Sequence, residues 1–345
     1  MDKNEKKSWL WPVILFSGVM LLFDAKSILI GAQEGIEISL QSIVPSLFPF
    51  IFISSLASQV ISGRKIPVLD KIGKVCGIPQ GAESLLLLGL IGGYPVGARL
   101  ISDNYRSGKL DAYCAQRMLG FCNNAGPAFI LGMLAPMFSN KIAPYALWII
   151  HMFSAILTGV ILPNKKTGQM HPVESTTFSV SVILENTMKA VCNICGWVIL
   201  FKSLIIVCEH SFLKLLPAEF AVVFSGLLEL SNGCISVNRI ANESARFLIS
   251  GTLLGFGGLC VVMQTKSAVR GLGISQYIQG KLLQTSISFI LCFGVSFLLF
   301  GWDRQYLTYY WIVFCISTLI IVKVFLYFFL MKKKRWHSEE VCCIM

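Results

Sequence analysis

Two adjacent asparagines interrupt an apolar segment in the stretch FCNNAGPAFILG, residues 121–132. Asn123 and Asn124 are followed by Gly126 and a proline, a combination that disfavours a continuous helix. At such a break one half-helix ends in free carbonyls that suit cations, and the next begins with free N–H groups that suit anions. The two side-chain amides can donate and accept hydrogen bonds at once. We therefore expect Asn123, Asn124 and Gly126 to bind a small polar ligand, with a simple proline kink as the alternative.

A second interruption lies in the apolar segment SLLLLGLIGGYPVGARL, residues 84–100. Its middle, GGYP, permits close approach of the backbone and carries one phenol. Arg99 follows one helical turn later, and it either joins this site or marks the cytoplasmic boundary of the segment. The ligand contacts that we predict at this tip are Gly92, Gly93, Tyr94 and Pro95.

A third interruption, LELSNG, places a carboxylate inside the apolar segment of residues 218–235. A charged side chain at membrane depth is costly and is usually functional. We expect Glu229 to act as a ligand, a proton-coupling group or a gating group, with Ser231 and Asn232 beside it in the site.

Helices that cross a membrane must carry these interruptions, because the chain of 345 residues is 55% hydrophobic and only 14% charged. Its apolar runs approach or exceed the roughly 20 residues that cross about 30 Å of hydrocarbon. The sequence thus predicts an all-α polytopic membrane protein. The net charge of +11 comes from Lys and Arg at the ends of these runs, where they set topology and contact lipid headgroups, so nucleic acid is not an expected partner. The runs are residues 9–23, 142–162, 191–207, 286–300 and 309–331.

Basic clusters predict the topology if both termini are cytoplasmic. A first helix, residues 9–30, then leaves the cytoplasm, and residues 43–61 return to it. Residues 84–100 are best placed as a re-entrant hairpin, because a full crossing would put the basic loop 102–109 outside. Residues 218–235 form a second hairpin, entering from the other side. The same rule places Arg64, Lys65, Lys71, Lys74, Lys165, Lys166, Lys266, Arg270 and Lys281 in the cytoplasm.

An inverted repeat follows from the order of these parts, which is a crossing helix, a re-entrant hairpin and a crossing helix broken by glycines. Short words recur in that order: GLIGG at 89–93 with GLLEL at 226–230, and LGF at 119–121 with LGF at 254–256. Secondary transporters with inverted repeats bind substrate near the membrane midplane between discontinuous helices. The expected division is a terminal helix and connector (1–42), a first gate repeat (43–162), a cytoplasmic loop (163–177), a second gate repeat (178–281), and C-terminal helices with a basic tail (282–345).

The motifs GLIGGYPVGARLI, GFCNNAGPAFILG and LLELSNG resemble those of the YlbJ-type sporulation integral membrane proteins, also called SpoVV, over most of the chain. That family carries a nucleoside-recognition gate domain and is related in plan to concentrative nucleoside transporters. The resemblance implies transport of dipicolinic acid across the outer forespore membrane during sporulation. It also implies that residues 92–97 and 229–233 are hairpin tips and that residues 123–127 are a broken helix. The first tip lacks the glutamine and glutamate expected for a nucleoside base, although a nucleoside or related solute carried across the plasma membrane remains the alternative.

An intramembrane enzyme is the alternative to a carrier, and the sequence argues against an enzyme. The histidines are scattered, no serine lies in a nucleophile motif, and no carboxylate pair is evident. Cys192 and Cys195 have metal spacing but lack a second pair, so we expect no metal, no cofactor and no catalytic residue. The expected partners are a small-molecule substrate and the lipid bilayer. A proton or sodium coupling ion and a homo-oligomer stay open.

The hairpin topology makes a prediction about the loop that contains Ser107. A cysteine introduced at Ser107, in a background without reactive thiols, should be protected from an impermeant thiol reagent applied to intact cells, as Lys166→Cys should be. Labelling at Ser107 with protection at Lys166 would remove the hairpin and the inverted repeat.

Overall fold

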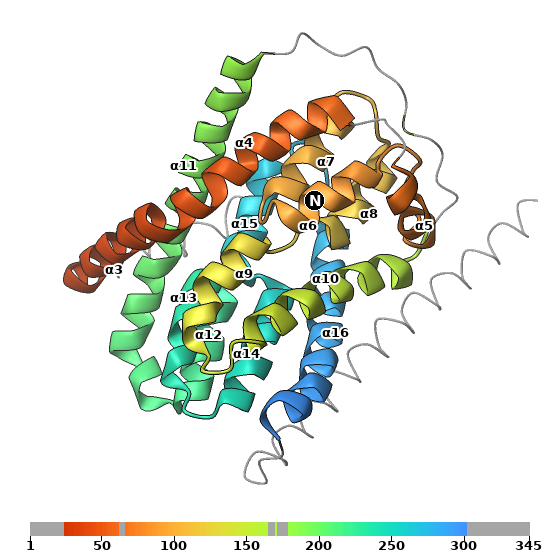
Figure 1. Cartoon of the computed structure of the whole chain (residues 1–345). Coiled ribbons are helices and arrows are strands. Elements are labelled where there is room, and N and C mark those ends of the chain that lie inside the picture. Colours follow the sequence, from red (N-terminus) through yellow and green to blue (C-terminus); the bar gives the residue numbers. More distant parts are fainter. Residues whose placement is uncertain (1–23, 62–65, 165–169, 171–178, 302–345) are drawn as a thin grey trace, which may run out of the picture.

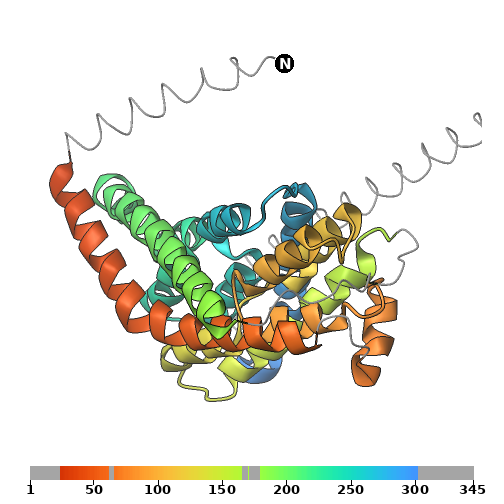
Figure 2. The same ribbon diagram turned by 90° about the horizontal axis from the view of Figure 1, so that it is seen from above.

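The computed structural model describes residues 24–61, 66–164, 170 and 179–301, and within these ranges the chain is helical and contains no β-strand (Figures 1 and 2). The chain is an all-α integral membrane protein. The runs 9–23 and 309–331 and the basic tail lie outside the described residues. Six described stretches are long and apolar enough to cross a membrane: Ala25–Ile61, Ala112–Met137, Ala143–Ile161, Val180–Ser211, Glu243–Ala268 and Ser275–Phe300.

The first described stretch is one continuous helix, so the reversal that we expected between residues 30 and 43 is wrong. It consists of α3 (Ala25–Ile38), a π-helical turn (Ser39–Ile43) and α4 (Val44–Ile61). The polar residues of the expected connector do not end the helix, because α3 packs closely along α11 (Val180–Ser211), as Figure 1 shows. A Cβ atom on Gly31 would lie 2.5 Å from the Cα atom of Ser203, so only glycine permits this approach.

The remaining helices belong to two halves of the chain. In the first half they are α5 (Pro67–Val75), α6 (Glu83–Ile91), α7 (Val96–Arg106), α8 (Ala112–Cys122), α9 (Pro127–Leu134) and α10 (Ala143–Ile161). In the second half α11 is followed by α12 (Ala218–Leu228), α13 (Leu230–Ser236), α14 (Glu243–Phe256), α15 (Gly258–Ala268) and α16 (Ser275–Phe300). Short 3-10 turns, Ala135–Met137, Leu213–Leu215 and Val237–Arg239, follow α9, α11 and α13.

Each half contains a helical hairpin closed by a pair of glycines. A Cβ atom on Gly89 of α6 would lie 3.4 Å from the Cα atom of Gly97 in α7, and one on Gly233 of α13 would lie 2.4 Å from the Cα atom of Gly226 in α12. In a straight helix, residues seven or eight apart are separated by roughly 10–12 Å. The chain therefore reverses at both sites. Gly89 and Gly226 are the first residues of the words GLIGG and GLLEL, so these words fall at equivalent positions in the two hairpins.

Each hairpin is followed by a helix that breaks. The two LGF words end the first parts of these helices, since α8 ends at Cys122 and α14 ends at Phe256. The chain is extended at Asn123 and Gly126, and it turns at Gly257, where φ is +85°. The predicted order of a long apolar helix, a helical hairpin and a broken helix is thus confirmed in both halves. The depth of the hairpins in a bilayer, the opposite orientation of the halves and the division into domains stay predictions.

A buried arginine joins the ends of two helices in the first half. The Arg117 guanidinium, on α8, donates hydrogen bonds to the carbonyls of Cys76 at 2.6 Å, Gly159 at 2.6 Å, Leu162 at 3.1 Å and Pro163 at 2.9 Å. These carbonyls lie at the carboxyl-terminal ends of α5 and α10, which carry partial negative charge. Arg117 thereby satisfies carbonyls that the two helices leave free.

Replacing Arg117 tests this role. Arg117→Met leaves several buried carbonyls without donors, and we expect the free energy of unfolding to fall by at least about 3 kcal/mol. The measurement is thermal or denaturant unfolding in detergent. Arg106→Met, on the exposed end of α7, is the control and should change stability by about 0.5 kcal/mol or less. Equal stability of the two variants would contradict the role of Arg117.

Candidate functional site

The tip of the first hairpin lies against the breaks of both halves. A Cβ atom on Gly126, in the α8–α9 break, would lie 3.0 Å from the backbone nitrogen of Gly93. A Cβ atom on Gly257, in the α14–α15 break, would lie 3.1 Å from the hydroxyl oxygen of Tyr94. The positive φ at Gly257 favours glycine, and the contact with Tyr94 leaves little room for a side chain. The Tyr94 side chain thus connects the first hairpin to the second half.

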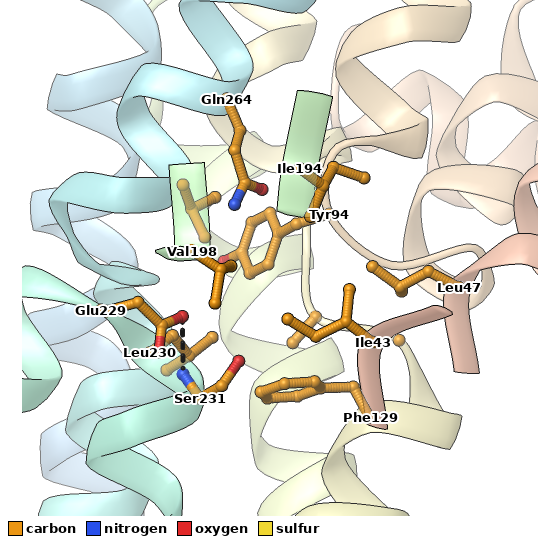
Figure 3. Close-up of a pocket in the computed structure, with 13 residues that line it drawn as sticks. Ile43, Leu47, Tyr94, Phe129, Ile194, Val198, Glu229, Leu230, Ser231 and Gln264 are labelled. Atoms are coloured by element: carbon orange, nitrogen blue, oxygen red, sulfur yellow. Dashed lines mark hydrogen bonds between the residues drawn. The ribbon is translucent and has the colours of Figure 1, made fainter. Parts of the chain in front are cut away.

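The tip of the second hairpin is shaped by its own carboxylate. Glu229 is 2% exposed, and its oxygens accept hydrogen bonds from the backbone N–H groups of Ser231 at 3.0 Å and Asn232 at 2.6 Å (Figure 3). These bonds cap α13 and hold the chain extended at Glu229. This tip also meets a break, since a Cβ atom on Gly258 would lie 3.2 Å from the backbone nitrogen of Leu230.

A cavity of about 40 Å³ lies between the two tips. This volume holds about two or three water molecules, whereas pockets for metabolites measure roughly 300 Å³ or more. In this structure the cavity is therefore too small to hold a metabolite. In Figure 3 the Tyr94 ring projects into the space between Gln264 and Phe129. The polar wall consists of Tyr94, Glu229, Ser231 and Gln264, and apolar residues of α4, α9 and α11, among them Leu47, Phe129 and Val198, complete it.

A lysine lies fully buried beside this cavity. The Lys281 ammonium, on α16, donates hydrogen bonds to the Tyr94 hydroxyl at 3.1 Å, the Asn124 Oδ1 at 3.1 Å and the Gln284 Oε1 at 2.7 Å. It also lies 5.0 Å from the centre of the Tyr94 ring. In the part of the chain that the structure describes, no carboxylate lies within 4.0 Å of it. Its hydrogen-bond partners are neutral groups, so the ammonium form of Lys281 has no direct counterion there.

Lys281 corrects an expectation about topology, because we placed it in the cytoplasm and it is 0% exposed. The close packing of α8 on α16 puts it there: a Cβ atom on Gly280 would lie 2.3 Å from the carbonyl oxygen of Gly120. That approach brings the residue after Gly280 against the α8–α9 break. The lone lysine at the start of a long apolar run, three residues before Gln284, was the available signal.

The paired asparagines are fully buried and bind other parts of the protein. Asn123 accepts a hydrogen bond from the Ala98 backbone N–H at 3.2 Å and donates to the Thr265 hydroxyl at 3.0 Å. Asn124 donates to the Phe121 carbonyl at 2.7 Å, and its Oδ1 accepts from both Lys281 and Gln284. Neither lines the cavity, so in this conformation they hold the break in place.

Histidine 151 is a further residue that the sequence did not reveal. Its Nε2 accepts a hydrogen bond from the Ala125 backbone N–H at 3.1 Å, and its carbonyl accepts a longer one, 3.4 Å, from Gln284. It thereby satisfies a donor that the broken helix leaves free. Because its role depends on a break 26 residues away in sequence, no local pattern around His151 marks it.

The predicted site residues lie at three distances from the cavity. Tyr94, Gly126, Glu229 and Ser231 line it. Gly92, Gly93 and Pro95 form the hairpin tip around Tyr94, and Asn123, Asn124 and Asn232 lie behind the wall. Arg99 lies further along α7, where it donates to the Asn186 carbonyl of α11 at 2.8 Å. Among the described residues no group of three or more His, Cys, Asp or Glu side chains could hold a metal ion, so we assign no described residue as a metal ligand.

Comparison with known proteins gives one partial match. A stretch of 107 residues is 26% identical to the sporulation integral membrane protein YlbJ of Bacillus subtilis (strain 168). The match covers 30% of this chain and 26% of that protein. No protein-family model and no solved structure matches the chain. The chain is thus an integral membrane protein with local similarity to a protein of sporulation.

Proposed function

We propose that the protein is a transporter of a small polar or anionic metabolite, which binds in the cavity between the hairpin tips. The observation that carries this proposal is the meeting of two hairpin tips and two helix breaks around one cavity. Backbone interrupted in this way is the form in which secondary transporters build substrate sites. Because the cavity of about 40 Å³ is too small for a metabolite, a hairpin must move for substrate to enter, and such movement is how a carrier alternates its access.

The charges around the cavity favour an anion. A buried ammonium without a counterion raises the local potential, and an entering anion lowers the cost of keeping it there. Lys281 is such a group, and it donates to Tyr94, which lines the cavity. The Glu229 carboxylate lies on the wall as well, but the N–H groups of Ser231 and Asn232 partly balance its charge.

Dipicolinic acid is the substrate that we propose within this class. Its planar ring suits apolar side chains such as Phe129 and Val198, and its two carboxylates suit the Tyr94, Ser231 and Gln264 donors. The similarity to a sporulation membrane protein supports a role in sporulation. We accordingly place the protein in the outer forespore membrane, with the metabolite and the lipid bilayer as its partners.

A nucleoside is the second candidate. Glu229 and Gln264 offer acceptors for hydroxyl and base N–H groups, and Phe129 offers a ring for stacking. A neutral nucleoside would leave Lys281 without a counterion, which is why we rank it second. An enzyme is a weaker alternative, since among the described lining residues Glu229 is the one carboxylate and no histidine accompanies Glu229 and Ser231.

Uptake into liposomes tests the proposal. Purified protein should accumulate labelled dipicolinate saturably and without chemical change, and an excess of unlabelled nucleoside should not compete. Saturable nucleoside uptake without dipicolinate uptake would favour the second candidate. Recovery of a converted compound would favour an enzyme, and no uptake of either would contradict both carrier proposals.

Lys281 provides a test of charge selectivity. Lys281→Met keeps much of the side-chain volume and removes the charge, so dipicolinate uptake should fall by about tenfold or more, because a hydrogen bond to a charged group contributes roughly 1.5–3 kcal/mol. Lys266→Met, on an exposed position of α15, is the matched control and should retain uptake. Unchanged dipicolinate affinity in Lys281→Met would mean that this lysine has no part in anion selection.

A further inference from the structure

A second lysine contacts the second hairpin. The Lys202 ammonium, on α11, donates a hydrogen bond of 2.6 Å to the Asn232 Oδ1. It also forms an ion pair of 2.9 Å with Glu34 of α3, whose side chain is 45% exposed while that of Lys202 is 8% exposed. Lys202 therefore has a counterion on the outside of the protein and a polar partner at the hairpin tip.

The contact with Lys202 fixes the orientation of the Asn232 amide. An ammonium only donates hydrogen bonds, so the amide atom that faces it must be the oxygen. The Nδ2 group then points the other way with two hydrogens to donate. Asn232 is 3% exposed, and its Nδ2 atom is buried without an acceptor in the described structure. A buried donor without a partner is costly, so its presence at a tip calls for an explanation.

This amide lies behind the wall of the cavity already described, one residue beyond its lining. Ile194 and Val198 of α11 line the cavity, and Lys202 follows them on the same helix face at intervals of four residues. On the other side, Leu230 and Ser231 line the cavity and precede Asn232 directly. A ligand can therefore reach the Nδ2 group only if the hairpin moves, and that movement belongs to the proposal below.

We propose that Asn232, held in position by Lys202 and its counterion Glu34, forms a polar subsite whose Nδ2 donates to a carboxylate oxygen of the transported anion. Asn232 contacts the ligand in this account, and Lys202 is a positioning residue. The subsite rests on the proposed function, since it deepens the same cavity. It explains why a charged pair links α3 to a hairpin tip, and it gives the unpartnered donor its acceptor.

The decisive variant is Asn232→Asp. It keeps an oxygen for Lys202 and so preserves the contact that holds the tip, but it replaces the donor by an acceptor. Two probes distinguish the outcomes: dipicolinate and its neutral counterpart pyridine-2,6-dicarboxamide, which offers N–H donors in place of one oxygen of each carboxylate. Binding of both is measured by calorimetry on the purified full-length protein in detergent.

We expect the wild type to prefer dipicolinate and Asn232→Asp to reverse that preference. Dipicolinate binding should weaken by about tenfold or more, while binding of the diamide stays the same or strengthens. Lys202→Met should weaken dipicolinate binding in the same direction, because the amide is then free to turn. Asn238→Asp, the same change at an exposed position after α13, should alter neither affinity.

The outcomes separate the two proposals. If the wild type binds neither probe, the proposal of dipicolinate as substrate fails and the subsite with it. If the wild type binds dipicolinate and Asn232→Asp binds it within about twofold of the wild type, the cavity proposal stands and the subsite is overturned. A parallel loss of both probes in Asn232→Asp, with the protein still folded, would show a structural asparagine and would likewise overturn the subsite.

Discussion

Backbone groups exposed by a broken helix must find partners inside the protein, because the hydrocarbon core of a bilayer offers none. The α8–α9 break shows how this chain meets that constraint. Ala98 donates to the Asn123 amide, Ala125 donates to His151, and Asn124 donates to the Phe121 carbonyl. The first hairpin, α16 and α10 must all lie against the break to supply these partners and the Lys281 contact. The cavity is the space that remains where these interrupted elements meet.

The order of the elements could be predicted because it depends on local signals. Glycine and proline inside apolar runs mark the points where a helix stops, and the recurring words fell on equivalent positions: Gly89 and Gly226 close the two hairpins, and the LGF words end α8 and α14. The same signals identified the cavity residues Tyr94, Glu229 and Ser231. Each lies at an interruption, where a polar residue in an apolar segment is unusual enough to be recognised from sequence.

The remaining site residues depend on which helices pack together, which no local pattern records. In the sequence, Lys281 looks like a lysine that marks the cytoplasmic end of a helix. In the structure, the close approach of α8 and α16 buries it. Lys202 lies inside a long apolar run. Its position there was a signal in the sequence, but a topology rule that considers only charges at helix ends does not use it. The two lysines have related roles, since one contacts the first hairpin tip and the other contacts the second. They differ in charge balance: Glu34 neutralises Lys202, whereas Lys281 has no carboxylate beside it among the described residues.

In the function that we propose, this cavity opens in turn to the two sides of the membrane. The most direct measurement places a single cysteine at Ser231, on the cavity wall, in a protein without other reactive thiols, and labels it in oriented vesicles with an impermeant reagent from either side. We expect labelling from both sides, each slowed by dipicolinate. Labelling from one side alone under every condition, with or without dipicolinate, would contradict this proposal.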